Sequence, residues 1–387
     1  MSITLTSLYE ILPKKCDSKA DLWQSHFVTL KDVLTKNGFE KLTSSSQQQN
    51  GHPGQDEVVT ECYCHHKNGR TILVTCCKDS MMLDLNERTQ PSRLSEYNEC
   101  AEQLQTDLYK ALRDYNINRV PTIRRGEKIW QYSECGDGRI AENNFTELLF
   151  DKTSEYQRVT IGYTKTYGKI LLLDWVENLA ESDDSYTTSL CGIDRGVTYQ
   201  DKSVLILGGG DGAALHCLRK LNPRMITMIE IDEMVLNACR THLRSCCGDS
   251  LDKYEGENYK IIVGDCIKYL EEYAREGRKF DYVISDITDV PIETNEKNNQ
   301  EIKESWLSGA GWKFFKQVFN YSLKLVETDG IIMTHITASL NVDGIKRFEV
   351  GINNLDEEVD YEMFDEFVPS FCEKWMFCHI KKRTAQK

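Results

Sequence analysis

The 387-residue chain has no long apolar run and no excess of positive charge. No stretch approaches the roughly eighteen consecutive apolar residues that a membrane-spanning helix needs. The N-terminal segment MSITLTSLYEILPKK lacks the basic and then apolar pattern of a signal peptide. The formal net charge of −14 disfavours nucleic acid and anionic membrane surfaces as partners. These absences predict a soluble, cytoplasmic protein, and the length predicts two or three domains.

The fifteen cysteines show no pattern that identifies a disulfide framework or a complete metal site. They are scattered and odd in number, which favours reduced thiols. Cys62, Cys64, His65 and His66 are zinc-type ligands, but their segment alternates as a strand would, and no second C-x-x-C pair completes the set. We therefore predict no metal site among these residues.

The segment Val204–Asp232 has the pattern that opens a βαβ unit. An apolar run predicts a buried strand at Val204–Leu207, and a glycine turn and a helical pattern follow it. Glycines in such a turn let the chain bend sharply and let a ligand approach the backbone. The second predicted strand ends on Glu230 and Asp232. An acid about 20 residues after such a glycine turn is placed to accept hydrogen bonds from ribose hydroxyls. This segment predicts a ligand that contains a nucleoside.

Asp211 lies inside the glycine turn, where a dinucleotide would place its pyrophosphate. Helix N-termini attract anions, but a fixed carboxylate at the same place repels a phosphate. Gly208, Gly210 and Ala213 still satisfy the pattern G-x-G-x-x-G/A, so an NAD-dependent dehydrogenase stays open as an alternative. A cationic nucleoside, such as a sulfonium, fits the carboxylate better.

Three regions differ in their predicted structure. Residues 1–120 predict an α+β domain for packing or dimerisation, with helices at Asp21–Asn37 and Leu94–Tyr115 and a polar loop at Ser44–Asp56. Arg119–Arg125 is interpreted as a linker into a small all-β domain, residues 121–176. Residues 177–387 alternate strands with helices, which predicts a Rossmann-like, doubly wound parallel sheet. The C-terminal Lys381–Lys387 is predicted to be a solvated tail.

Acidic residues follow four successive predicted strands of the last region. Ligands of such sheets bind at the carboxyl ends of the strands. One acid alone is usually a helix cap, or closes an Asx turn, whereas acids after four strands outline a site lined with carboxylates. Asp286, at the tip of the strand FDYVIS, is placed to act as a base. The acids are Asp211, Glu230, Asp232, Asp265, Asp286 and Asp289.

Two further acidic segments carry less information. The segment NLAESDDSY, residues 178–186, either caps a helix or lines the entry to the same site. Glu373 precedes the strand-like KWMFCHI and is interpreted as an exposed strand residue.

These motifs resemble those of the aminopropyltransferases that make polyamines. The resemblance rests on NLAESDDSY, VLILGGGDG, MIEID, GDC and YVISDITDVPI, in this order. Within the family the chain is most similar to the spermine synthases, because of the DITDVPI segment. The N-terminal region resembles their dimerisation domain, whose fold is like S-adenosylmethionine decarboxylase, and the middle region resembles their small β domain.

The resemblance implies a class I methyltransferase-like catalytic fold and an aminopropyl transfer. The donor would be decarboxylated S-adenosylmethionine, a co-substrate, and the acceptor spermidine. The products would be spermine and methylthioadenosine. A homodimer through the N-terminal domain is implied as well.

The same resemblance implies roles for single residues. Asp286 matches the general base, and Asp211 the glycine-loop acid near the reacting amine. The donor would be bound by Gln157, Gly208, Gly210, Gly212, Glu230, Asp232, Asp265 and Cys266. The acceptor would be bound by Asp183, Tyr186, Asp211, Asp289, Phe371 and Glu373.

Three positions depart from the family pattern. Ala213 replaces a glycine, Phe371 replaces a tyrosine, and Asp289 is an aspartate as in spermidine synthases. These departures leave a putrescine-using spermidine synthase open. An S-adenosylmethionine-dependent methyltransferase and a catalytically lapsed scaffold are further alternatives.

Overall fold

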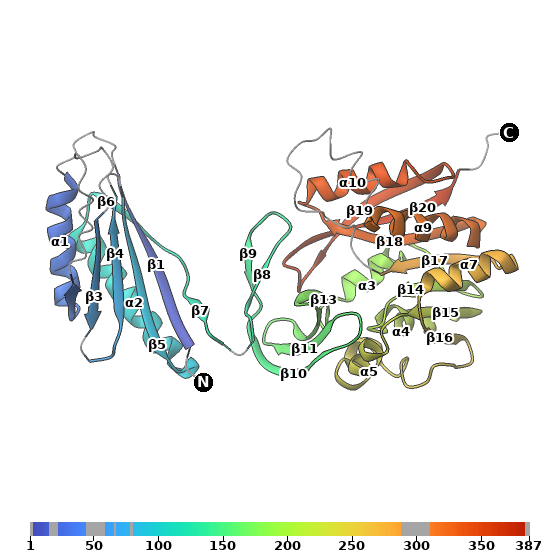
Figure 1. Cartoon of the computed structure of the whole chain (residues 1–387), viewed down its shortest axis with the longest axis horizontal. Coiled ribbons are helices and arrows are strands. Elements are labelled where there is room, and N and C mark those ends of the chain that lie inside the picture. Colours follow the sequence, from blue (N-terminus) through green and yellow to red (C-terminus); the bar gives the residue numbers. More distant parts are fainter. Residues whose placement is uncertain are drawn as a thin grey trace. The chain divides into compact units, whose positions relative to one another are not determined.

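The computed structural model describes residues 3–14, 22–43, 59–65, 67–77, 80–127, 129–287 and 310–383. The chain forms two compact units, Met1–Trp130 and Gln131–Lys387, each of which is visible in Figure 1. Two predictions lie outside the described residues, the loop Ser44–Asp56 and the acceptor residue Asp289. No helix in the described ranges is both long and apolar enough to cross a membrane.

The first unit is one antiparallel sheet with two helices on it. The sheet order is β2-β3-β4-β5-β1-β6, and β7 also pairs with β1. Helices α1 and α2 contribute their apolar residues to a single core together with alternate residues of the strands. This α+β arrangement agrees with the prediction, while a likeness to S-adenosylmethionine decarboxylase stays a prediction. The elements are β1 (Ile3–Pro13), α1 (Leu22–Lys36), β2 (Phe39–Thr43), β3 (Val59–His65), β4 (Thr71–Cys76), β5 (Met81–Thr89), α2 (Leu94–Ala111), β6 (Tyr115–Arg119) and β7 (Ile123–Arg125), with a 3₁₀ turn at Pro91–Arg93.

Two predictions for this unit were wrong at their boundaries. The second helix ends at Ala111 instead of Tyr115, because β6 begins there and pairs with β1. The predicted linker Arg119–Arg125 contains β7, which also pairs with β1. Strand β1 itself was not predicted, since its buried face includes Ser7, whose hydroxyl finds a partner on Thr122. A polar residue at that position breaks the alternation that identifies a strand.

The second unit begins with β-structure that was predicted as a separate domain. A hairpin of β8 (Tyr132–Glu134) and β9 (Ile140–Glu142) precedes a four-stranded antiparallel sheet. Its strands are β10 (Phe145–Thr153), β11 (Arg158–Thr164), β12 (Gly168–Leu173) and β13 (Val176–Ala180). Val159, Ile161 and Leu171 share one hydrophobic core with the parallel sheet that follows.

Two elements in this part differ from the prediction. The segment Ala141–Phe150, whose pattern predicts a single strand, is split into β9 and β10, because Asn144 between them has a φ of 57°. The pattern after Val176 predicts a helix, but this helix begins only at Asp184, since β13 intervenes and extends the sheet.

A seven-stranded sheet with the order β16-β15-β14-β17-β18-β20-β19 forms the centre of the second unit. The first five of these strands are parallel, which confirms the doubly wound sheet. The chain runs outward from β14 and then returns to β17 on its other side, so strand order reverses between β14 and β17. The strands are β14 (Ser203–Gly208), β15 (Met225–Glu230), β16 (Tyr259–Val263), β17 (Phe280–Asp286), β18 (Val326–Ala338), β19 (Val359–Val368) and β20 (Glu373–Lys382).

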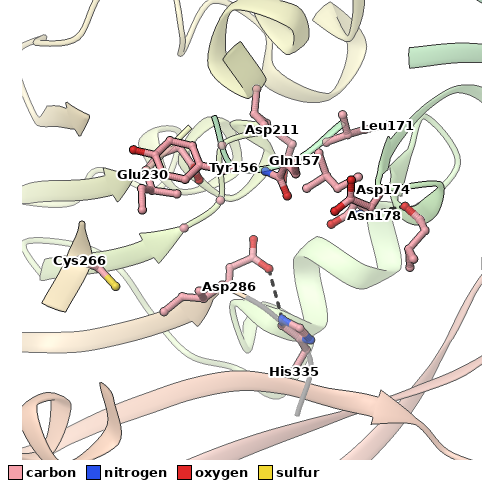
Figure 2. A pocket seen from close by; sticks show the side chains of 18 of the residues that line it. Tyr156, Gln157, Leu171, Asp174, Asn178, Asp211, Glu230, Cys266, Asp286 and His335 are labelled. Atoms are coloured by element: carbon pink, nitrogen blue, oxygen red, sulfur yellow. Dashed lines mark hydrogen bonds and ion pairs between the residues drawn. The ribbon is translucent and has the colours of Figure 1, made fainter. Parts of the chain in front are cut away.

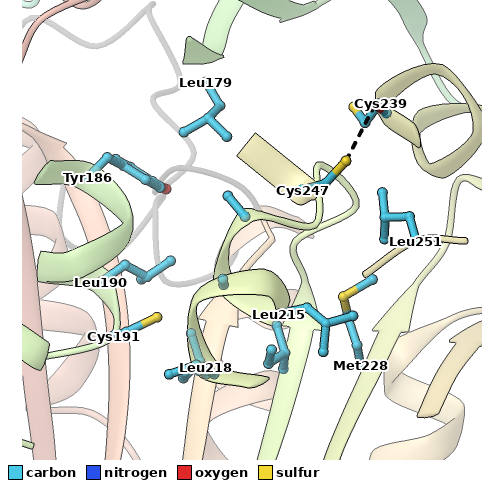
Figure 3. Close-up of a cluster of buried hydrophobic side chains, with 14 of the residues drawn as sticks. Leu179, Tyr186, Leu190, Cys191, Leu215, Leu218, Met228, Cys239, Cys247 and Leu251 are labelled. Carbon is cyan, nitrogen blue, oxygen red and sulfur yellow. Dashed lines mark hydrogen bonds between the residues drawn. The ribbon is translucent and has the colours of Figure 1, made fainter. Parts of the chain in front are cut away.

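Helices cover both faces of this sheet, and the apolar strands fill a core on each side. Val204 and Ile206 point into one core, part of which Figure 3 shows, and Leu205 and Leu207 point into the other. The helices are α3 (Asp184–Leu190), α4 (Ala213–Arg219), α5 (Glu233–His242), α6 (Arg244–Cys247), α7 (Cys266–Glu276), α9 (Ala310–Leu325) and α10 (Val342–Ile352), with a 3₁₀ turn at Ile193–Arg195. The predicted C-terminal tail begins instead as part of β20, which runs to Lys382.

Candidate active site

A cavity of about 500 Å³ lies at the carboxyl ends of β14, β15 and β17, where strand order reverses (Figure 2). This is the position and the size expected of a small-molecule site in such a sheet. Among the described residues that line it, none is Lys or Arg. The lining instead has acidic side chains, Asp174, Glu177, Asp211, Glu230, Asp265 and Asp286, and aromatic ones, Tyr156, Tyr186, Phe314, Phe371 and Trp375.

The glycine turn brings β14 against β17. Gly208 is the register partner of Asp286 and has a φ of +79°. A Cβ on Gly208 would lie 2.0 Å from the carbonyl oxygen of Asp286, and one on Gly210 would lie 2.8 Å from the carboxyl carbon of Glu230. Gly208 and Gly210 line the cavity, whereas Gly212 faces Leu251 and Cys247 in the core behind it. These glycines are therefore required first by close packing within the protein.

Asp286 lies in the cavity at the tip of β17, as predicted. The Tyr186 hydroxyl donates a hydrogen bond of 2.9 Å to Asp286 Oδ1. The Nε2 atom of His335 lies 3.9 Å from the same oxygen. His335 was not predicted, although it directly follows the segment Ile331–Thr334, whose apolar pattern predicts a strand, at the sheet edge where the acids also lie.

Two carboxyl groups of the cavity bind protons unusually strongly. Burial, reinforced by the charge of Asp286, raises the pKa of Asp211 to about 7, although the Ala213 N–H donates a bond of 2.7 Å to it. Burial also raises the pKa of Glu230 to about 7, although its carboxylate accepts the N–H of Asp232 at 2.8 Å. The charge of Asp211, fixed in our sequence argument, therefore depends on pH and on the ligand.

The predicted donor residues lie in and directly behind the cavity. Gln157, Glu230, Asp265 and Cys266 line it. Asp265 also caps α7, since its carboxylate accepts the N–H of Ile267 at 2.9 Å. Asp265 therefore both caps a helix and lines the cavity.

Asp232 lies behind the residues that line the cavity and does not line it itself. It is 1% exposed, caps α5 through the Met234 N–H, and accepts a hydrogen bond of 3.2 Å from Gln157 Nε2. It therefore orients Gln157.

The predicted acceptor residues separate into two groups. Tyr186 and Phe371 line the cavity with ring centroids 5.9 Å apart, and Trp375, which was not predicted, lies 4.8 Å from Phe371. Asp183 and Glu373 do not line it.

Both outlying acids bind backbone groups inside the protein. Asp183 is 1% exposed and accepts the N–H groups of Ala180 at 2.7 Å and Ser370 at 3.0 Å, so it fixes the segment that carries Phe371. Glu373 is 7% exposed and accepts the Gly136 N–H at 3.0 Å, and burial raises its pKa. Its interpretation as an exposed strand residue was wrong, because the β8–β9 hairpin covers it.

The turn between β12 and β13 and the start of β13 bring Asp174, Glu177 and Asn178 to the cavity. Asn178 belongs to the acidic segment 178–186, whereas the sequence did not indicate Asp174 and Glu177. Asp174 and Trp175 form this two-residue turn with φ values of 51° and 68°. Asn-Gly is the usual sequence there, so the turn carried no signal. Arg158 stabilises this turn, since its backbone N–H donates to Asp174 Oδ1 at 2.8 Å and its guanidinium lies 4.7 Å from the Trp175 ring centroid.

Within the described ranges, no three His, Cys, Asp or Glu side chains are grouped so that they could hold a metal ion. Of the zinc-type ligands in the sequence, Cys62 and Cys64 lie on β3, and His66 is outside the described residues.

Comparison with known proteins gives the family of the chain. The family model of the spermine/spermidine synthase domain matches residues 183–387, which is more than half of the chain, and that of the spermidine synthase tetramerisation domain matches residues 129–181. A polyamine aminopropyltransferase of Aeropyrum pernix is 26% identical over 243 residues, 62% of this chain and 70% of that protein. One of Thermococcus kodakarensis is 37% identical over 146 residues, 36% of this chain and 49% of that protein.

Solved structures agree with the fold. The spermidine synthase of Thermotoga maritima superposes with a TM-score of 0.52 over 67% of this chain and 81% of that chain, at 15% sequence identity. A spermidine synthase in complex with the transition-state analogue AdoDATO has the same TM-score at 16% identity. The chain therefore belongs to the spermine/spermidine synthase family of polyamine aminopropyltransferases.

Proposed function

We propose that this protein transfers the aminopropyl group of decarboxylated S-adenosylmethionine to spermidine and so forms spermine and methylthioadenosine. The observation that carries the proposal is Asp286, which Tyr186 holds in a cavity lined by carboxylates and aromatic rings. Carboxylates and aromatic faces both attract ammonium and sulfonium groups. A cavity of this composition suits a polyamine and a cationic nucleoside.

The order of residues along the cavity supports one orientation of the two substrates. In Figure 2, Glu230 and Cys266 lie on one side, Asp174 and Asn178 on the other, and Asp286 between them. An acid that follows the second strand of such a sheet accepts hydrogen bonds from ribose hydroxyls. The adenosine of the donor is therefore placed beside Glu230. The reactive methylene then comes near Asp286, and the polyamine extends toward the turn between β12 and β13.

The proposed reaction needs one base and accurate positioning. The free amine of the acceptor attacks the methylene next to the sulfonium, the C–N bond forms, and the C–S bond breaks. The electron pair of the C–S bond neutralises the sulfur, and Asp286 takes the proton from the new ammonium. Because a sulfonium is already a good leaving group, this scheme uses no metal and no redox cofactor. Positioning of the reactants supplies a large part of the rate enhancement.

Spermidine as the acceptor is proposed from the DITDVPI segment, of which only Asp286 and Ile287 are among the described residues. Spermidine synthesis from putrescine is the second candidate, favoured by Asp289 and by the spermidine synthases among the structural neighbours. The test is a product assay with decarboxylated donor and with putrescine and spermidine in competition. We expect spermine to predominate. Predominant spermidine would establish the second candidate, and absence of both products would overturn the proposal.

Donor choice separates this function from methyl transfer. Ordinary S-adenosylmethionine carries a carboxylate that Asp211 and Asp286 repel when they are ionised. We expect calorimetry to show weaker binding of S-adenosylmethionine than of its decarboxylated form. Equal affinities would support a methyltransferase instead.

Donor binding is expected to strengthen as the pH rises from about 6 to 8. The raised pKa values of Asp211 and Glu230 mean that both groups are partly protonated near pH 7, whereas a cationic donor favours their ionised forms. Binding therefore releases protons, which calorimetry at pH 7 detects as a dependence of the heat on the ionisation enthalpy of the buffer. A heat that is the same in all buffers contradicts this prediction.

The same raised pKa values predict how stability depends on pH. Carboxyl groups of the unfolded chain titrate near pH 4, so between about pH 4 and 7 the folded protein binds more protons at Asp211 and Glu230 than the unfolded chain does. Their contribution to the free energy of unfolding therefore decreases as the pH rises through this window. Asp211→Asn is expected to weaken this dependence in pH-dependent thermal melts, and an unchanged dependence contradicts it.

We also propose that the protein is cytosolic and that it forms a homodimer through its first unit. Leu73 on β4 and Met82 on β5 are 38% and 40% exposed, and both belong to the strand positions that point away from the core of α1 and α2. Sedimentation equilibrium is expected to give a dimer for the wild-type protein and a monomer for Leu73→Glu/Met82→Glu. A variant that stays dimeric excludes this face.

A further inference from the structure

His335 lies at the carboxyl end of β18, directly beside Asp286. Thr334 is the register partner of Ser285, so residue 335 comes opposite residue 286 across the parallel pair β17–β18. The distance from His335 Nε2 to Asp286 Oδ1 is 3.9 Å, the contact drawn in Figure 2. The imidazole is 8% exposed and lines the cavity. It thus touches both the base and the space from which a proton must leave.

Tyr186 binds the same carboxylate oxygen but cannot accept a proton from it. Its hydroxyl donates to Asp286 Oδ1 at 2.9 Å, and its ring centroid lies 5.9 Å from that of His335. A tyrosine hydroxyl is a donor and a poor base near neutral pH, so it orients the carboxylate. An imidazole gains and loses a proton in this pH range.

We propose that His335 takes the proton that Asp286 removes from the attacking amine and so restores the ionised base within each turnover. The inference rests on the proposed aminopropyl transfer. The N–H bond of the new ammonium breaks and its proton moves to Asp286. The proton then passes to the lone pair of neutral His335 Nε2, which leaves a carboxylate beside an imidazolium. The imidazolium finally releases the proton to water through the cavity.

The present 3.9 Å separation is longer than a hydrogen bond. Contacts between catalytic groups are often long without substrate and tighten in the substrate complex. Transfer therefore requires the carboxylate and the imidazole to approach each other by about 1 Å.

The groups around this pair can stabilise the imidazolium that the proton transfer forms. From β20, the register partner of His335 is Phe377, which is uncharged. Ionised carboxylates near Asp286 stabilise a positive charge on the imidazole, and burial keeps the nearby thiol protonated by raising its pKa well above the usual value. Among the described residues, the ionisable groups of other elements that interact with Asp286 include Tyr186 of α3, Cys191 directly after α3, Asp211 of the glycine turn and Glu230 of β15.

The test replaces His335 by a side chain that forms hydrogen bonds but does not titrate. His335→Gln is expected to lower kcat at pH 8 by about 10- to 100-fold, with KM for the donor changed less than about twofold. In the wild-type enzyme kcat falls as the pH is lowered through the pKa of the pair. In the variant this fall moves to more acidic pH, because only a carboxyl group remains. Both substrates are kept saturating, since kcat reports the substrate complex and kcat/KM also reports Asp211 and Glu230 in the free enzyme.

His379→Gln is the matched control. His379 is buried in β20 of the same sheet, and burial lowers its pKa. This variant is expected to keep the wild-type kcat and pH profile. Wild-type kcat and pH profile in His335→Gln overturn the inference.

A second variant covers the case in which His335→Gln does not fold. Imidazole added to His335→Ala is expected to restore kcat, and substituted imidazoles of higher basicity should restore more. Rescue that is independent of basicity, or no rescue in a folded protein, overturns the proton transfer. Wild-type protein that forms no product with either polyamine counts against the proposed function itself, so the two failures are distinguishable.

Discussion

Asp286→Asn is expected to lower kcat by about 10²- to 10⁴-fold, the usual contribution of a general base. The amide is nearly the same size and still accepts the Tyr186 hydroxyl, so the geometry at Oδ1 is retained. It cannot take a proton from the new ammonium, which is the step that the proposed mechanism requires. Donor affinity is expected to change little, because Glu230, Asp265 and Gln157 remain. Single-turnover kinetics and calorimetry measure the two effects separately.

Asp281→Asn provides the control on the same strand. Asp281 lies at the opposite end of β17, where it pairs with Lys202 at 2.9 Å and accepts the Ser203 N–H at 2.8 Å. Its loss weakens a structural contact far from the cavity, so kcat should stay at the wild-type level. A folded Asp286→Asn variant with undiminished kcat excludes Asp286 as the base and favours a different base.

Gly208→Ala is expected to remove activity and to destabilise the second unit by about 3 kcal/mol or more. The new Cβ would lie 2.0 Å from the carbonyl oxygen of Asp286 and 2.7 Å from its carbonyl carbon. Backbone cannot yield as a flexible side chain can, so β14 and β17 must separate at the point where the base is carried. The left-handed φ of +79° adds further strain. Thermal unfolding and kcat report the two consequences.

Gly277→Ala isolates the backbone strain from the clash. Gly277 ends α7 with a φ of +69°, but no heavy atom lies within 4 Å of its added Cβ. We expect a cost of about 1 kcal/mol, a decrease in melting temperature of about 2–4 °C, and full activity. If Gly208→Ala behaves like this control, the close approach of the two strands does not position Asp286.

Asp286→Asn and Gly208→Ala each change one residue of the same register pair, Gly208 and Asp286. The sheet places the glycine turn and the base in register because strand order reverses between their strands. Donor binding and proton removal therefore depend on the same backbone contact.

The sequence by itself determined the parallel sheet and the main acids of the site. Continuous apolar runs followed by glycines or acids predict buried strands and their carboxyl ends, and the ends of parallel strands meet at one edge. That reasoning placed Asp211, Glu230, Asp265 and Asp286 together, and the structure brings all four to the cavity. It worked because these residues are close to their strands in sequence, so local pattern fixes their position.

Only the tertiary structure decided the functions of residues whose partners are distant in sequence. Asp183 binds the backbone of Ser370, and Glu373 binds that of Gly136, so neither carboxylate lines the cavity. His335 becomes a neighbour of Asp286 only through the pairing of β17 with β18. Asp174 reaches the cavity through a turn that Arg158 stabilises from another strand. In each case the local sequence shows an acid or a histidine, and a contact with a remote segment decides whether it faces the ligand or the protein.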